Sequence, residues 1–282
     1  MLKLIRGAGF FLLLFFTSHP VWAGQTTITW HGHAAFEVVT PKGKVLMIDP
    51  WLKNPANPRA KDGADPLAEI VKVHYILISH GHFDHIGDAV ALANKTRARL
   101  VTNYELGTNM VKILGFPKKQ VGFDTLMNTG GEITIGGGEV TVSLTHAVHS
   151  SGMKNPNATQ NQPDIVYGGN PTGILLKIKG GPTIYHTGDT AYFKDMELIG
   201  ENYQPDIALI NIGGHFGMEP LMAAKAAQAV QAKIAVPHHF ATFPILTMSA
   251  EEFGNKVKEN GIEFLEMKPG ETIVFEGADL VK

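Results

Sequence analysis

The sequence predicts an α/β fold in which two β-sheets pack against each other and helices flank them. Of the 282 residues, 44% are hydrophobic and only 18% are charged, so the chain can build a sizeable core and disorder is excluded as its main state. Short runs rich in β-branched and aromatic residues alternate with helical patterns, and Gly, Pro or Asn separates them. No linker or repeat divides the chain, which indicates a single domain.

The first 23 residues predict a secretory signal peptide. A basic start with Lys3 and Arg6 precedes an apolar run, and a small-x-small style ending closes the segment at Ala23. The run contains Pro20 and is shorter than the roughly 20 apolar residues that a membrane span needs. We therefore expect cleavage after Ala23 and export to the periplasm or the medium, with no stable membrane association afterwards. The alternative is an uncleaved N-terminal anchor.

The remaining residues, 24–282, form the predicted domain, whose elements follow from hydrophobic patterning. The predicted strands are Thr26–Trp30, Ala35–Val39, Val45–Ile48, Tyr75–Ser79, Leu100–Thr102, Glu132–Ile135, Val140–Thr145, Ile174–Ile178, Thr183–His186, Ile207–Asn211, Ile234–Val236, Phe264–Met267 and Thr272–Phe275. The predicted helices are Pro66–Val71, Asp88–Lys95, Tyr104–Leu114, Lys194–Ile199, Pro220–Ala232 and Ala250–Asn260. Two segments rich in Pro, Gly and Asn predict surface loops, Leu52–Asp65 and Gly152–Gly173. The length of the second favours a lid over a site.

Composition narrows the classes of function. The formal charge is -2, and no run of Lys and Arg occurs along the chain, so nucleic acid is not expected as a partner. Cysteine is absent, which excludes disulfides, thiolate metal sites and a cysteine nucleophile. The Gly-x-Ser-x-Gly motif of many serine hydrolases is absent as well. The 13 histidines are the remaining source of chemistry.

The densest histidine segment follows an apolar strand. After Tyr75–Ser79 the chain continues as His80-Gly-His82-Phe-Asp84-His85. Residues two apart in an extended segment point the same way, so His80 and His82 can share one cation, whereas Asp84 and His85 can hold a second. Imidazole and carboxylate suit Zn, Fe or Mn. Such a cluster of polar groups after a buried strand would be costly unless it bound something.

This segment resembles the signature of the metallo-β-lactamase superfamily, and further motifs follow in the order found there. They are Trp30-His-Gly-His33-Ala, Asp49-Pro50-Trp51, Thr145-His146-Ala-Val-His149, His186-Thr-Gly-Asp189 and Pro237-His238-His239 with Thr242-Phe243. The similarity covers residues 26–276. It is most specific to a branch of largely uncharacterised metal-dependent hydrolases, which also resembles ascorbate-phosphate lactonases and N-acyl-phosphatidylethanolamine phospholipases. It implies an αββα sandwich with a site along one edge between the sheets.

The resemblance also implies two divalent cations, with Zn favoured and Mn or Fe as alternatives. The implied ligands are His80, His82 and His149 at one site, Asp84, His85 and His239 at the other, and Asp189 between them. Two choices stay open. His149 is favoured over His146 because small residues follow it, and His239 is favoured over His238 by the alignment of the residues around it. The Asp49 carboxylate is expected to support the histidine segment.

These ligands predict a hydrolase that acts on a small-molecule substrate. Two cations lower the pKa of a water between them from about 15.7 towards about 7, which gives a metal-bound hydroxide as nucleophile. Asp84 can orient that hydroxide and carry its proton. His33 or His215, if either faces the site, could stabilise the oxyanion or protonate the leaving group, and the alternative for both is a supporting role. The predicted reaction is hydrolysis of an ester, lactone, amide or phosphodiester.

Two other classes of function remain as alternatives, a metal-binding protein without catalysis and a metal-dependent redox protein. The redox class usually carries Glu at the place of His82, which disfavours it. Aromatic residues that could form the walls of a substrate pocket, or equally the core, are Trp51, Tyr167, Phe193, Phe216 and Phe243.

Overall fold

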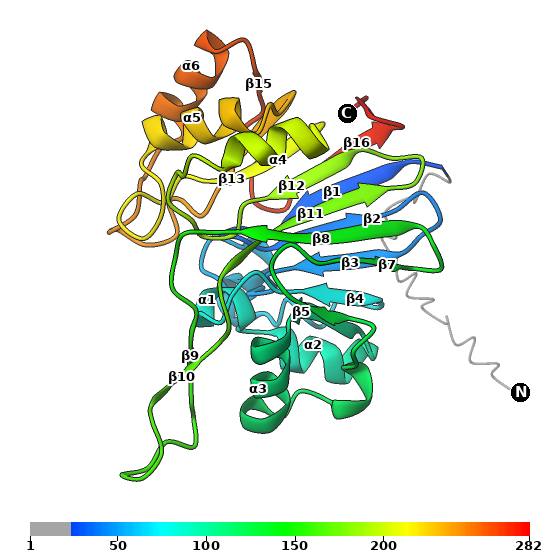
Figure 1. The fold of residues 1–282 in the computed structure, drawn as a ribbon, viewed down its shortest axis with the longest axis vertical. Helices are drawn as coiled ribbons and strands as arrows, with labels where there is room; N and C mark the ends of the chain where they lie inside the picture. The colour runs from blue at the N-terminus through cyan, green and yellow to red at the C-terminus, as the bar shows by residue number, and fades with distance from the viewer. Residues whose placement is uncertain (1–23) are drawn as a thin grey trace, which may run out of the picture.

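A computed structural model describes residues 24–282, as two large sheets with helices on their outer faces (Figure 1). The predicted signal peptide, residues 1–23, lies outside the described residues. Among residues 24–282, no helix combines the length and the apolar character needed to cross a membrane.

The first sheet has eight strands in the order β17-β16-β1-β2-β3-β4-β5-β6. Its strands are β1 Thr26–Trp30, β2 Phe36–Val39, β3 Val45–Ile48, β4 Tyr75–Leu77, β5 Arg99–Asn103, β6 Leu126–Met127, β16 Thr272–Glu276 and β17 Asp279–Leu280. The helical segments associated with it are η1 Pro58–Gly63, α1 Phe83–Ile86, α2 Ala89–Thr96, α3 Tyr104–Leu114 and η2 Lys118–Gln120. Because β3 and β4 are parallel, the segments that follow them emerge at the same edge.

The second sheet has seven strands in the order β15-β14-β13-β12-β11-β8-β7. Its strands are β7 Glu132–Ile135, β8 Val140–His146, β11 Thr172–Ile178, β12 Thr183–His186, β13 Ile207–Asn211, β14 Ile234–His238 and β15 Glu263–Phe264. Its helices are α4 Met196–Tyr203, α5 Pro220–Ala229 and α6 Glu251–Glu259. Strands β12, β13 and β14 are parallel, so their carboxyl ends also meet at one edge.

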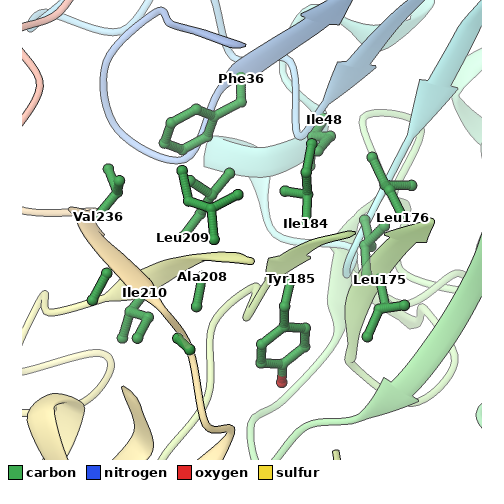
Figure 2. Packing of buried hydrophobic residues seen from close by; sticks show 14 of the residues in the cluster. Phe36, Ile48, Leu175, Leu176, Ile184, Tyr185, Ala208, Leu209, Ile210 and Val236 are labelled. Carbon is green, nitrogen blue, oxygen red and sulfur yellow. The ribbon is translucent and has the colours of Figure 1, made fainter. Parts of the chain in front are cut away.

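The core between the sheets follows from the period of two along each strand. Ile184 and Leu209 point toward Phe36 of the first sheet, whereas Tyr185, the next residue after Ile184, points to the opposite face (Figure 2). On the first sheet, Met47 belongs instead to a second core that packs against the helices of that sheet. Each sheet is therefore buried on both faces, and the predicted four-layer α/β sandwich is confirmed.

Most predicted elements are observed with small shifts of their ends, but the predicted helix Pro66–Val71 is wrong, and only Phe264 of the predicted strand Phe264–Met267 lies in a strand. The chain there forms hydrogen-bonded turns, with bonds from Ala68 N to Asp65 O and from Ile70 N to Leu67 O. Leu67 and Ile70 of this segment are buried in the second core, so the turns already bury the apolar residues that suggested a helix, whereas Val71 is 90% exposed.

The Gly152–Gly173 segment forms a hairpin of β9 Gly152–Lys154 and β10 Ile165–Tyr167. Met153 is fully buried in the core beside α3, and Asn109 Nδ2 of α3 donates a hydrogen bond to Tyr167 O at 2.7 Å. The hairpin lies beside α3 and extends beyond it (Figure 1). The structure therefore does not place this segment as the lid that its length predicted.

Folding gathers basic side chains that are separate in the sequence. Arg97, Arg99, Lys118 and Lys119 line one groove of about 630 Å³ at the end of α2. Arg99 is paired with Asp124 at 2.6 Å. A count of local Lys and Arg runs cannot detect this patch, because it forms only when η2 packs beside the end of α2.

Shortening Leu209 should destabilise the protein, because this fully buried side chain fills the space between the sheets. We expect Leu209→Ala to lower the free energy of unfolding by about 2–5 kcal/mol. Urea denaturation followed by circular dichroism measures the change. The matched control is Leu198→Ala on α4, where the side chain is 53% exposed and the loss should be far smaller. Equal losses in the two variants would contradict the assigned packing.

Candidate metal centre

Histidine and aspartate side chains from both sheets converge at the edge where the parallel strands end. Within residues 24–282, three groups have ligand atoms that all lie within 4.8 Å of one another. They are His80 with His82 and His149, His33 with Asp84, His85 and His239, and His80 with His85 and Asp189. Each predicted metal ligand belongs to at least one of these groups.

The first donor group is His80, His82 and His149. His82 Nδ1 lies 3.0 Å from His80 Nε2 and 3.3 Å from His149 Nε2, so three ring nitrogens face a common point. His146, the alternative to His149, ends β8 with an exposed ring that packs against Phe193 at 5.2 Å. The structure thus brings His149, and not His146, to the other two histidines.

The second donor group is Asp84, His85 and His239, together with His33. His239 Nε2 lies 3.5 Å from Asp84 Oδ2. His238, the alternative to His239, is buried on the opposite side of the chain, where its ring stacks on His186 at 4.4 Å. Successive residues at the end of a strand point to opposite sides, so only His239 reaches this group.

Asp189 lies between the two donor groups. Its Oδ2 atom is 4.0 Å from His80 Nε2 and 3.7 Å from His149 Nε2. The same atom is 3.4 Å from His85 Nε2 and 3.2 Å from His239 Nε2. The other oxygen, Oδ1, accepts a hydrogen bond from Asn211 Nδ2 at 2.6 Å, which fixes the orientation of the carboxylate. Asp189 is therefore positioned to bridge two cations.

Asp49 supports the histidine segment from behind. Its fully buried carboxylate accepts hydrogen bonds from Ser79 N at 2.8 Å, Ser79 Oγ at 2.6 Å and His85 Nδ1 at 2.8 Å. Because Nδ1 of His85 bonds to Asp49, Nε2 is the atom that faces the centre and that would bind a metal. Ser79 Oγ also lies 3.0 Å from His80 Nδ1, which orients that ring in the same way.

Unpaired nitrogen atoms show that these residues fit a metal. His85 Nε2 and His239 Nε2 are buried, and neither has a hydrogen-bond partner among the described residues. Leaving a buried polar atom unpaired costs about 1–3 kcal/mol, so such atoms call for a ligand. Histidine nitrogen with carboxylate oxygen is a donor set that Zn, Mn and Fe accept.

The pKa values of the histidines divide them into two classes. Burial lowers the pKa of His80, His82 and His149, so all three are neutral near pH 7 and can offer a lone pair to a cation. Burial also acts on His239, but Asp189 and Asp84 outweigh it and raise its pKa to about 9. The carboxylates therefore hold positive charge in the centre, and a metal that binds there must displace protons.

His33 is fully buried and holds Asp84. Its Nε2 lies 3.0 Å from Asp84 Oδ2, and its Nδ1 lies 2.9 Å from Thr242 Oγ1. Burial, together with the neighbouring His239, lowers the pKa of His33 to about 4, so the ring is neutral. A carboxylate only accepts, so Nε2 donates to Asp84 and Nδ1 accepts from Thr242. Both nitrogens are engaged, which favours the supporting role over direct action on a substrate.

The structure does not bring His215 to the centre. Its side chain is exposed, its ring contact is with Phe216 at 4.6 Å, and none of the described hydrogen bonds or ion pairs joins it to the donor groups. Three supporting residues went unpredicted, Ser79, Asn211 and Thr242. Asn211 had one signal, since it is the polar end of an otherwise apolar buried strand.

Comparisons with known proteins agree with this geometry. Residues 44–240 match the family model of the beta-lactamase superfamily domain. The chain is 47% identical over 268 residues to a UPF0173 metal-dependent hydrolase of Thermodesulfovibrio yellowstonii, which covers 94% of this chain and 98% of that protein. It is also 47% identical over 254 residues to one from Anaeromyxobacter sp. strain K, with 89% and 88% covered. A metallo hydrolase structure from Ignicoccus hospitalis superposes with a TM-score of 0.74 at 32% identity, covering 89% of this chain and 99% of that one.

Removing the bridging carboxylate should lower the metal content. We expect Asp189→Ala, reconstituted with Zn and desalted, to retain at least one equivalent less than the unaltered protein, because Asp189 Oδ2 is close to histidines of both groups. Elemental analysis of the purified proteins measures this. Asp206→Ala is the matched control, since Asp206 is a buried aspartate paired with Lys233. Unchanged zinc content in Asp189→Ala would remove this residue from the ligand set.

Proposed function

The chain belongs to the beta-lactamase superfamily and within it to the UPF0173 metal-dependent hydrolases, and we propose that it hydrolyses an ester, lactone, amide or phosphodiester with two divalent cations as cofactors. The observation that carries the proposal is the position of Asp189 Oδ2, which lies within 4.0 Å of one ring nitrogen from each of four histidines. All four histidines belong to one of the two donor groups, and each group combines histidines from both sheets. The arrangement fits two cations that share one carboxylate.

When bound, divalent cations at these residues would acidify water towards a pKa of about 7 and polarise the oxygen under attack. Asp84 is the residue placed to handle the proton. Its carboxylate is 14% exposed, and the neighbouring His239 and His33 outweigh burial and hold its pKa well below the usual range. It is therefore ionised at neutral pH, and His33 keeps it in place. We propose that Asp84 orients the attacking water and accepts its proton.

The donor set supports zinc as the first choice of metal, with manganese or iron as alternatives. The chain contains no cysteine, so nitrogen and oxygen are the available donors. His82 Nδ1 faces the first donor group, at the position where the redox class usually has Glu. This supports hydrolysis over redox chemistry for the centre.

We also propose that the protein is exported after removal of residues 1–23. The described fold supports this, because β1 begins at Thr26 and the backbone of Gly24 already bonds to Pro41 O at 3.2 Å. Cleavage after Ala23 would thus leave every described strand and helix intact. Intact mass analysis of protein from the producing cells should give a chain that begins at Gly24 and resides outside the cytoplasm. A full-length cytoplasmic chain would refute export.

Metal removal should abolish turnover, and neutralisation of Asp84 should slow it strongly. Dialysis against EDTA should remove esterase or phosphodiesterase activity, and Zn or Mn should restore it. Asp84→Asn should lower kcat by about 100-fold or more, because the amide cannot accept the proton. Steady-state kinetics of the zinc-loaded proteins measures both, with Asp124→Asn as the exposed control. Full activity in a rigorously metal-free preparation would refute the proposal.

A further inference from the structure

Three aromatic side chains border the centre on the side of Asp84, and we call Trp51, Phe83 and Phe243 the aromatic rim. The Trp51 ring lies 5.6 Å from Phe83 and stacks on Phe243 at 5.7 Å. It also meets the edge of His33 at 5.1 Å. Since His33 is bonded to Asp84, only one imidazole separates the rim from the carboxylate that handles the proton. Phe83 itself lies in the chain between His82 and Asp84.

Trp51 of the rim is held rigidly by the residues around it. A Cβ atom at Gly87 would lie 2.6 Å from Trp51 Cδ1, so the indole can pack against the end of α1 only because residue 87 is glycine. Behind it, the fully buried Asn54 donates from Nδ2 to Trp51 O at 2.7 Å. A rigid surface loses little conformational entropy when a ligand covers it, which favours binding.

The outer face of the rim is open to solvent. Phe83 is 60% exposed, although its neighbours Trp51 and Phe243 are partly buried. A single exposed phenylalanine is ordinary, but this one extends a continuous aromatic surface that begins beside Asp84. An apolar group that covers this surface would be held next to the reacting bond.

The charges around the centre favour an uncharged substrate. Within residues 24–282, the ion pairs of Asp84 and Asp189 involve histidines alone, and the charged groups that most strongly shift their pKa values are histidines as well. Lys53, two residues after Trp51, is near Asp65 and Asp88 at 4.0 and 3.9 Å. Phosphate and carboxylate groups are normally recognised by Arg or Lys, and the described centre offers neither.

We propose that the aromatic rim binds the apolar acyl group of an uncharged carboxylic ester, lactone or amide, and that such compounds are the substrates. In the reaction the oxygen of water forms a bond to the acyl carbon, and the bond to the leaving oxygen or nitrogen breaks. One proton of the water passes to the leaving group. The other is lost to solvent when the product is released as a carboxylate. This inference rests on the proposed hydrolase function and specifies its substrate class.

A series of p-nitrophenyl esters tests the inference on the zinc-loaded protein. From acetate through butyrate and hexanoate to octanoate, kcat/KM should rise about twofold or more per methylene, since each methylene that the rim covers is removed from water. Phe83→Ala should flatten this rise, because it removes the most exposed ring of the rim. The matched control is Phe123→Ala, where the ring is 85% exposed and stacks on Tyr104, and it should keep the full rise.

A binding measurement separates recognition from catalysis. Tryptophan fluorescence of the metal-free protein should change when 2-decanone, an uncharged compound that resists hydrolysis, is added, and Trp51→Phe should remove the change. If acetate is hydrolysed but kcat/KM does not depend on chain length, or if Phe83→Ala keeps the rise in kcat/KM, the rim does not bind the acyl group. Either result would leave the proposed hydrolase function unaffected. If bis(p-nitrophenyl) phosphate is turned over faster than p-nitrophenyl hexanoate, the proposal that uncharged acyl compounds are the substrates is wrong. Failure to hydrolyse any ester or phosphodiester would instead refute the hydrolase function, while the fluorescence titration still decides whether the rim binds apolar groups.

Discussion

The buried carboxylate of Asp49 is the constraint on which the centre depends. A charge inside a protein is tolerated only when hydrogen bonds replace its water, and Asp49 obtains three from Ser79 and His85. In return it fixes the proton of His85 on Nδ1 and, through the hydroxyl of Ser79, orients His80. These two histidines belong to different donor groups, so one carboxylate behind the centre aligns both halves of it.

Sequence reasoning succeeded where a feature is local and failed where it is assembled by the fold. Strands such as β12 and β13 have the predicted ends, because apolar runs bounded by turn residues define them. The segment from His80 to His85 was equally predictable, since four ligand-type residues follow a buried strand. The contacts of His33 could not be predicted, because its two partners lie 51 and 209 residues further along the chain. The preference for His149 over His146 agrees with the structure, but it came from the motif, because composition does not encode which way each ring points after β8.

Backbone conformation was the other feature beyond sequence reasoning. His33, Asp49 and His239 have φ values of 52°, 44° and 61°, in the left-handed region that disfavours residues other than glycine. Such conformations cost about 1 kcal/mol or more each and persist only when the surroundings enforce them. The turn at Asp49 also leads directly into Trp51, so the same strained segment carries the support for His85 and the anchor of the aromatic rim. The orientation of His85 and the position of Trp51 are thereby tied to one short piece of chain.

The donor groups also span the interface between the two layers of strands. His80 and His82 follow β4 of the first sheet, whereas His149 follows β8 of the second, and His85 and His239 are divided in the same way. A cation bound to either group would join the two sheets, as a disulfide joins segments in other proteins. A ligand that binds only the folded state at 100 times its Kd adds about 2.7 kcal/mol of stability. The supply of free metal would therefore set how often the sandwich opens and how long the chain survives among proteases, whether or not any substrate is present.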